Sequence, residues 1–419
     1  EYSKLITATV DFSSETDSGL AKIFHELEGD CCKYIDDVLY VYLDGEWRIV
    51  DTKNPCVLRH FIVTTLDNKL SSVISDFKKK LLETDSTALT QQLGKLFALK
   101  DTINGMTKIT SITKRYMDSL VSENLNAEDV FDKHPYIFRF KNRAFDIQAG
   151  VELGITKEHY ITQRTSQEFI PPTPEQLRVI DNLFNQIFPD PEVKECYLSI
   201  MFQSLTGVRQ ERLILANGGG RNGKGLLNEL MFQLMGSYAY KLPVELLTKE
   251  LNTTGANPQL ANCDKKRLIL ASEPEDGTKL QMGVVKEMTG GNEISARGLY
   301  SSKTHVTMNQ VLLLECNKKP QLSGRIDTSV LERIVDVPFE STFTTNPDNV
   351  DNEKGIFMAN TLYKTEEWRK EHASALFIYI VHKAKKELYI PDRVRMISEQ
   401  YVMGSDELYS WTMDGYSLT

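Results

Sequence analysis

The sequence predicts an α/β protein with a central parallel sheet, preceded by an α+β domain and followed by a helical C-terminal region. Three observations support this prediction. A β-favouring run, a glycine-rich loop and a helical pattern follow one another within residues 211–229. Two wholly apolar segments, residues 268–271 and 311–314, have the composition of strands buried on both faces of a parallel sheet. Mostly helical patterns precede and follow this region.

Composition narrows the class of protein. The 419 residues suffice for two or three domains of globular composition. The net charge of −9 argues against a surface coated with basic groups for duplex DNA, but it leaves room for a local basic channel. The six cysteines form no C-x-x-C pair, which disfavours zinc and suits a reducing compartment. No membrane span or signal peptide is visible, and the missing initiator Met suggests a piece of a longer polypeptide.

Residues 1–170 are expected to form the α+β domain. Within residues 13–30, apolar side chains recur at helical intervals, so a helix is predicted there. Two β-favouring runs, residues 38–43 and 47–50, flank an Asp-Gly pair. Because Asp-Gly accepts positive φ angles, we predict a hairpin.

The remainder of this domain is predicted to be helical and then β-rich. Residues 54–125 have a mostly helical pattern. Residues 134–165 favour strands and interleave aromatic with basic side chains, which can mark nucleic-acid contact but more often belongs to an ordinary sheet. The Pro-rich stretch 171–174 is the clearest linker, and Thr173 is predicted to cap a helix that begins at Pro174.

The predicted core occupies residues 174–345 and begins with a helical lead-in at 174–210. Asp190, followed by a proline, is expected to start the second helix of this lead-in. Residues 346–419 are expected to form a helical lid or collar.

The glycine-rich loop has the properties of a phosphate-binding P-loop. Glycines let successive backbone N–H groups curve around an anion, and the next helix directs its positive end at the same place. Lys224 supplies a full charge for the β- and γ-phosphates. The consensus G-x-x-x-x-G-K-[ST] is matched except at Gly225, where a Mg²⁺-binding hydroxyl is usual. The residues expected to bind phosphate are Gly218, Gly219, Gly220, Arg221, Asn222, Gly223, Lys224, Gly225 and Leu226.

Acidic and polar residues follow the two apolar strands of the core. Ligands of doubly wound sheets bind at the carboxyl ends of the strands. Glu273, with Glu275 as the alternative, follows residues 268–271 and can hold Mg²⁺ or polarise the attacking water. Asn317 follows residues 311–314 and can orient that water or contact the γ-phosphate. An ordinary loop or cap role is the alternative for each residue taken singly.

Basic residues mark two further segments of the core. Two β-like arms flank residues 300–303, which predicts a hairpin with Lys303 near its tip. Arg333 directly precedes a short apolar strand, and an arginine there can reach a nucleotide on a neighbouring subunit. An internal ion pair with Asp327 or Asp336 is the structural alternative.

The order of these segments resembles that of superfamily III helicases, the compact ring helicases of DNA viruses and of phage or plasmid replicons. Their four motifs correspond here to GGGRNGKG, LILASEPE, KEMTGGNEISAR and LLLECN. The stretches VYLDGEWRIV and HPYIFRFKNRAFDI resemble the domain before the helicase in the poxvirus-type primase–helicase of nucleocytoplasmic large DNA viruses. African swine fever virus is the nearest source that the resemblance suggests. It covers most of residues 13–340.

For the nucleotide, the resemblance implies an AAA+-like P-loop core with ATP and Mg²⁺ as cofactors. Lys224 and the loop glycines would bind the ATP phosphates. Glu273 would serve Mg²⁺ and water activation, and Asn317 would act as the sensor. Arg333 matches the arginine finger that a neighbouring subunit supplies in trans.

For DNA, the resemblance implies a ring, expected to be a hexamer, that encloses a single strand and separates a forked duplex. Lys303, flanked by Ser302 and Thr304, would face the DNA in the channel. Lys286 and Arg297 match the hairpin motif without an assigned role. A primase domain is expected on the same longer polypeptide, and a soluble protein of the host cytoplasm, at the viral replication site, is implied.

Two functions of different classes fit these observations. The first is an ATP-driven DNA helicase or translocase at a viral replication fork, which the hairpin with Lys303 favours. The second is a P-loop ATPase or nucleotide-dependent module that loads or remodels a partner without unwinding. The net charge of −9 keeps the second function open.

Overall fold

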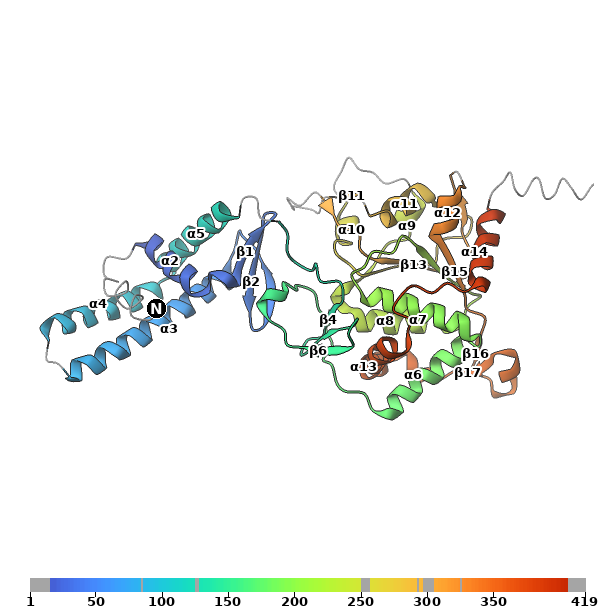
Figure 1. Ribbon diagram of the computed structural model, residues 1–419, viewed down its shortest axis with the longest axis horizontal. Coiled ribbons are helices and arrows are strands. Elements are labelled where there is room, and N and C mark those ends of the chain that lie inside the picture. Colours follow the sequence, from blue (N-terminus) through green and yellow to red (C-terminus); the bar gives the residue numbers. More distant parts are fainter. Residues whose placement is uncertain are drawn as a thin grey trace, which may run out of the picture. The chain divides into compact units, whose positions relative to one another are not determined.

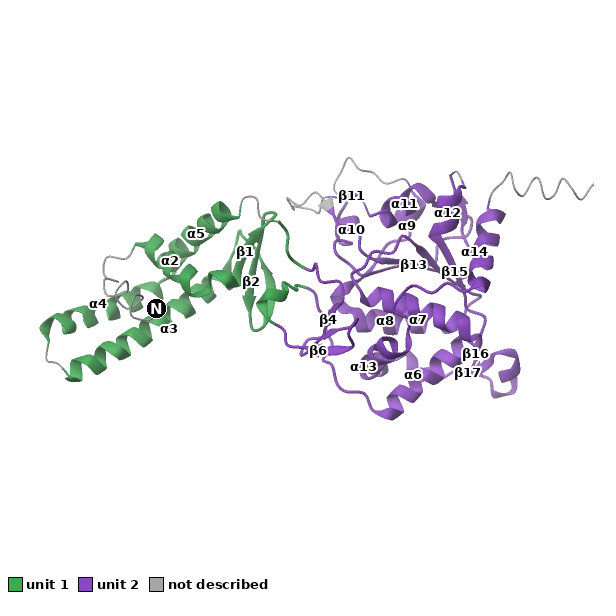
Figure 2. Ribbon diagram, viewed as in Figure 1, with its two compact units in different colours: residues 1–131, 156–162 green, residues 132–155, 163–419 purple. Residues whose placement is uncertain are grey.

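The computed structural model describes residues 16–83, 86–124, 128–249, 257–291, 294–296, 305–324 and 326–405. The chain divides into two compact units, coloured separately in Figure 2. The first unit comprises residues 1–131 and 156–162, and the second comprises residues 132–155 and 163–419. The order of elements along the chain can be followed in Figure 1.

The first unit combines helices with an antiparallel sheet. Its helices are α2 (Asp17–Glu28), α3 (Cys56–Glu83), α4 (Thr87–Ile103) and α5 (Met106–Glu123). Its strands, in the order β1-β2-β3, are β1 (Cys32–Ile35), β2 (Val38–Leu43) and β3 (Glu46–Val50). The predicted hairpin is confirmed, since Leu43 pairs with Glu46 and both turn residues, Asp44 and Gly45, have positive φ. Apolar side chains from all these elements, most of them aliphatic, form one core.

The second unit is built on a five-stranded parallel sheet. Its strands are β7 (Leu213–Asn217), β8 (Ala239–Lys241), β9 (Leu268–Ser272), β13 (Val311–Cys316) and β15 (Ile334–Pro338). They lie in the order β15-β7-β13-β9-β8, and every neighbouring pair is parallel. Because all strands run the same way, their carboxyl ends share one edge of the sheet.

Helices cover both faces of this sheet (Figure 1). On one face lie α6 (Pro174–Ile187), α7 (Pro191–Leu205), α8 (Lys224–Met235) and α13 (Glu366–Lys383). The other face is covered by α9 (Glu245–Thr248), α10 (Pro258–Ala261), α11 (Met282–Thr289) and α12 (Thr328–Arg333). Helix α14 (Asp392–Gly404) packs along β15. Apolar residues at successive strand positions therefore enter two different cores, as in a sheet buried on both faces.

Small sheets complete the second unit. An antiparallel sheet contains β4 (Ile137–Arg139), β5 (Ala144–Asp146) and β6 (Val151–Leu153). Three two-stranded sheets pair β10 (Lys279–Gln281) with β14 (Gln321–Ser323), β11 (Ile294–Ser295) with β12 (His305–Val306), and β16 (Thr342–Thr344) with β17 (Ile356–Met358).

The division into units differs from the expected boundary near residues 171–174. The β-rich segment before that linker belongs to the second unit, because Phe138, Phe140 and Ile147 enter the core beneath α8 and α13. The predicted caps at the linker are confirmed. The Thr173 side chain accepts a hydrogen bond from the Gln176 N–H at the start of α6, and Asp190 caps α7 in the same way.

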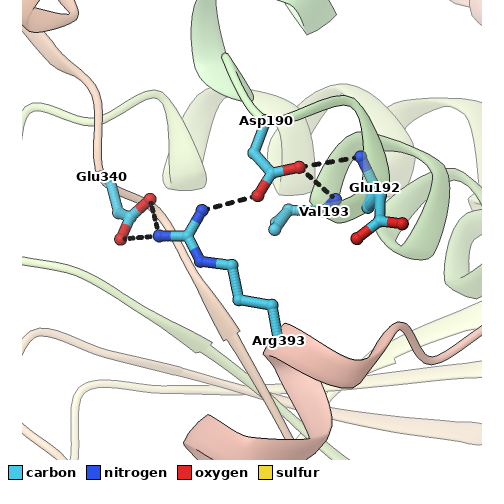
Figure 3. Close-up of polar contacts among 5 residues, drawn as sticks. All are labelled: Asp190, Glu192, Val193, Glu340 and Arg393. Atoms are coloured by element: carbon cyan, nitrogen blue, oxygen red, sulfur yellow. Dashed lines mark hydrogen bonds and ion pairs between the residues drawn. The ribbon is translucent and has the colours of Figure 1, made fainter.

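The C-terminal helices also belong to the second unit and do not form a separate collar in this division. Helix α13 packs on α6 and α8. Arg393 of α14 donates to Asp190, the cap of α7, and to Glu340, which follows β15 (Figure 3). The bond from Arg393 lowers the pKa of Asp190. Among the described residues, no helix combines the length and the apolar character that a membrane crossing requires.

Candidate active site

The glycine-rich loop joins β7 to α8 at the carboxyl edge of the sheet. Gly220, Arg221 and Gly223 have φ angles of 88°, 51° and 82°, so the backbone turns repeatedly through the left-handed region. A Cβ atom on Gly218 would collide with the backbone oxygen of Phe339, and one on Gly223 would lie 2.6 Å from the Ile187 side chain. The backbone therefore approaches its neighbours too closely for a larger residue at either position.

Lys224 is the first residue of α8 and is only 4% exposed. Its Nζ lies 2.8 Å from the Cys316 carbonyl oxygen, 3.1 Å from Asn317 Oδ1 and 3.4 Å from the Gly218 carbonyl oxygen. Within the part of the chain that the structure describes, no carboxylate forms an ion pair with Lys224. A buried ammonium held only by neutral oxygens attracts an anion strongly, since the loop excludes much of the screening water.

The structure brings Asn317 and Glu273 to Lys224. Asn317 Nδ2 donates to Glu273 Oε2 at 3.0 Å, while its Oδ1 accepts from Lys224. Glu273 has a φ of 49° and its N–H bonds to the carbonyl of Glu315 on the next strand, which turns the chain away after β9. Glu275 is exposed, and its side chain makes no hydrogen bond or ion pair with other described residues. Of the two predicted acids, Glu273 is the one in contact with the lysine–asparagine pair.

Four polar residues beside this group were not singled out from the sequence. Glu315 Oε2 accepts from Ser272 Oγ at 3.0 Å, and its Oε1 accepts from Asn228 Nδ2 at 2.5 Å. The buried Tyr197 hydroxyl bonds to Asn228 Oδ1. Burial raises the Tyr197 pKa, and the negative charge of Glu315 adds to that effect. Glu315 could have been found from the sequence, because it is an acid two positions after the apolar Leu313 and so points to the same face of the strand.

Arg333 lies at the opposite edge of the sheet. It is the last residue of α12, and the next residue, Ile334, pairs with Leu213 at the start of β7. Five strand residues at about 3.3 Å each place it about 16 Å along the sheet from the glycine-rich loop. Arg333 Nη1 donates to the Ser329 carbonyl at 3.1 Å.

Neither ion pair considered for Arg333 forms. Asp327 pairs with Lys286 at 3.0 Å, and Asp336 pairs with Lys319. Hydrogen bonds from Ser329 and Lys286 lower the Asp327 pKa to about 2. The predicted motif residue Lys286 thus holds Asp327, which caps the helix that ends at Arg333.

The predicted DNA-contacting residues Lys303, Ser302 and Thr304, and the motif residue Arg297, lie outside the described residues. The arms of the predicted hairpin are described. They form β11 and β12, which pair antiparallel with Ile294 opposite Val306.

Comparisons with known proteins find relatives in large DNA viruses. No protein-family model matches the chain. A protein of Acanthamoeba polyphaga mimivirus, provisionally named a helicase, is 23% identical over 394 residues, covering 88% of this chain and 40% of its own length. Primase D5 of fowlpox virus is 23% identical over 240 residues, covering 54% of this chain and 30% of its own. The chain is therefore similar to proteins of large DNA viruses whose names include helicase and primase.

The viral relatives are much longer than this chain, which spans 40%, 34% and 34% of the length of three of them. Among solved structures, the apo C-terminal region of NrS-1 is 10% identical with a TM-score of 0.49, over 94% of this chain and 76% of that one. That score is too low to establish a common fold.

Proposed function

We propose that the chain is the ATP-hydrolysing motor of a viral primase–helicase, an ATP-dependent DNA helicase or translocase that separates strands at a replication fork. The observation that carries this proposal is Lys224. Its buried ammonium lies beneath a glycine-rich loop, at the start of a helix and beside the end of β13, with no acid partner among the described residues. We also assign the second unit to the AAA+-like P-loop class on this arrangement.

The roles follow from the geometry at the carboxyl edge. The loop N–H groups and Lys224 bind the β- and γ-phosphates, where the helix dipole adds to the attraction. When bound, ATP supplies the phosphoryl group for transfer to water, and Mg²⁺ neutralises charge on the phosphates. Glu273 would bind the metal and polarise the attacking water. Asn317 bonds to both Lys224 and Glu273 and so fixes their positions relative to each other.

A second subunit is needed to complete this site. Arg333 lies at the amino edge of its own sheet, too far from its own loop for one side chain to span. In a ring, the amino edge of one subunit can face the carboxyl edge of the next, where an arginine stabilises transition-state charge. We propose a hexameric ring for this reason and because of the family.

DNA is the proposed partner, with Lys303, Ser302 and Thr304 at the hairpin tip facing a single strand in the channel. The relatives' names include both helicase and primase, so a primase domain is proposed on the same longer polypeptide. The proposed place of action is the viral replication site in the host cytoplasm.

A strand-separation assay on forked DNA tests the proposal. With ATP and Mg²⁺, the chain should release the displaced strand, and the same protein without ATP should not. ATP hydrolysis without strand release would favour the alternative, a module that loads or remodels a partner, which the net charge of −9 also fits. Absence of nucleotide binding would reject both.

A further inference from the structure

The face of the sheet beneath α8 carries one acid at its carboxyl edge. Because side chains alternate between the two faces along each strand, the alternation determines which residue near the carboxyl end of each strand points toward α8. Those residues are Ala216 in β7, Glu315 in β13 and Ser272 in β9, and the strand register sets the three side by side. Glu315 is the carboxylate among these three neighbours.

Two residues near Glu315 lack the groups that usually hold Mg²⁺ in a P-loop protein. Gly225, in the first turn of α8, has no hydroxyl, and a Cβ built on it meets no atom within 4 Å. Ser272, at the end of β9, has no carboxylate. Ser272 adjoins Glu315, because its Oγ lies 3.0 Å from Glu315 Oε2. Gly225 lies one helical turn before Asn228, which bonds to Glu315 Oε1.

Glu315 has the capacity to bind a cation. Its two oxygens offer about four acceptor positions. The side-chain bonds from Ser272 and Asn228 use two of them and fix the direction of the carboxylate. No Lys or Arg neutralises Glu315 within the described ranges. Those ranges contain no cluster of three or more metal-binding side chains, but nucleotide-bound Mg²⁺ needs only one or two carboxylates besides phosphate and water.

We propose that Glu315 ligates the Mg²⁺ that accompanies the nucleotide, directly or through one water, in place of the acid absent at Ser272. This inference rests on the proposed function, since it assumes that the glycine-rich loop binds ATP. It refines the proposed function, which gives both the metal and the attacking water to Glu273, by assigning the two roles to two acids. Glu315, beneath α8, serves the metal, whereas Glu273, in contact with Asn317, serves the attacking water.

A purely structural role is the competing explanation. Glu315 could exist only to accept from Asn228 and so hold α8 and Tyr197 in place. Glutamine preserves the shape and one acceptor oxygen but removes the charge. The two roles therefore differ in metal dependence more than in stability.

The test measures binding of a fluorescent ATP analogue while Mg²⁺ is titrated. Without metal, the affinity of Glu315→Gln for the analogue should lie within about twofold of that of the unaltered protein. The Mg²⁺ midpoint, which is the Mg²⁺ concentration that gives half of the metal-dependent gain in affinity, should rise roughly tenfold or more in this variant. Glu245→Gln, an exposed acid on α9, is the matched control and should not shift that midpoint. An unshifted midpoint in folded Glu315→Gln would overturn the inference. If the unaltered protein binds no nucleotide, the proposed function fails instead.

A rescue experiment keeps the inference testable if the single variant is less stable. Ser272→Asp combined with Glu315→Gln returns a carboxylate to the same place from the neighbouring strand. The double variant should recover the Mg²⁺ midpoint to within about threefold, whereas Ser272→Ala in the same background should not. If the folded double variant does not recover the Mg²⁺ midpoint, the role of Glu315 is structural, namely to accept the hydrogen bond from Asn228, and the inference is wrong.

Discussion

The two edges of the parallel sheet in the second unit each carry basic residues, but the surroundings of those residues differ. At the carboxyl edge, Lys224 donates to Asn317 and to the carbonyl oxygens of Gly218 and Cys316, and Asn317 in turn donates to Glu273. At the amino edge, Arg267 precedes β9 and Arg333 precedes β15. The comparison separates charged residues whose polar groups are bonded within the fold from charged residues that can act on a nucleotide.

Arg267 has a structural role. It is 5% exposed, and its guanidinium donates to the carbonyls of Leu205 at 2.7 Å and Ile137 at 2.9 Å while lying over the Tyr238 ring. Arg333 makes one bond, to Ser329, and its Nε is buried with no partner among the described residues. Two arginines at equivalent ends of parallel strands thus have different expected functions, one structural and one catalytic in a neighbouring subunit.

The largest expected effect is at the carboxyl edge. Lys224→Ala should abolish ATP hydrolysis and weaken nucleotide binding by roughly tenfold to a hundredfold, because a charge-assisted contact is lost. Lys383→Ala, an exposed lysine at the end of α13, is the control and should change neither. Steady-state turnover and equilibrium binding measure the two effects. Near-normal turnover in Lys224→Ala would reject the phosphate-binding assignment.

Arg333→Ala should lower ATP turnover by about 10³-fold while leaving nucleotide affinity within a few-fold. The reason is that an arginine finger acts on the transition state and not on the bound ground state. Arg395→Ala, an exposed arginine on α14, should leave turnover unchanged. Equal loss of binding and turnover would instead place Arg333 among the residues that hold the nucleotide or the fold.

Glu273→Gln should bind ATP normally and hydrolyse it roughly 10²-fold or more slowly, because the amide keeps the shape and cannot polarise water. Glu275→Gln is the built-in comparison and should be mild, since its side chain contacts none of the other described site residues. Single-turnover hydrolysis separates chemistry from product release. The reverse pattern would assign the catalytic role to Glu275.

Arg267→Met should affect stability and not chemistry. Removing the guanidinium leaves buried carbonyls of Leu205 and Ile137 without donors, so the free energy of unfolding should fall by about 3 kcal/mol. Turnover per folded molecule should stay near normal at low temperature. Denaturant unfolding and turnover, measured together, check this. Lost turnover in a fully folded variant would mean that both amino-edge arginines serve catalysis.

The sequence was sufficient to predict the residues defined by local patterns. The apolar runs at 268–271 and 311–314 became parallel strands, and the loop before Lys224 took the predicted place between strand and helix. Asn317 and Glu273 could be expected to meet, because both follow strands of one parallel sheet.

Residues whose surroundings depend on long-range register could not be predicted. Glu315 lies beside Ser272 only because β13 pairs with β9 at one particular offset, across 43 positions of sequence. Likewise, Arg267 and Arg333 both precede apolar strands in the sequence, and only the packing of β4 and α7 around Arg267 distinguishes them. Strand composition carries neither kind of information.

The central claim is that one ATP site combines the carboxyl edge of one subunit with the amino edge of the next. Mixing Arg333→Ala with Lys224→Ala subunits tests it most directly, after co-assembly is shown by size and labelled subunits. Each variant alone should hydrolyse almost no ATP. Together they should regain measurable turnover, because some interfaces then join an intact loop to an intact arginine. Co-assembled mixtures that stay inactive would contradict the claim.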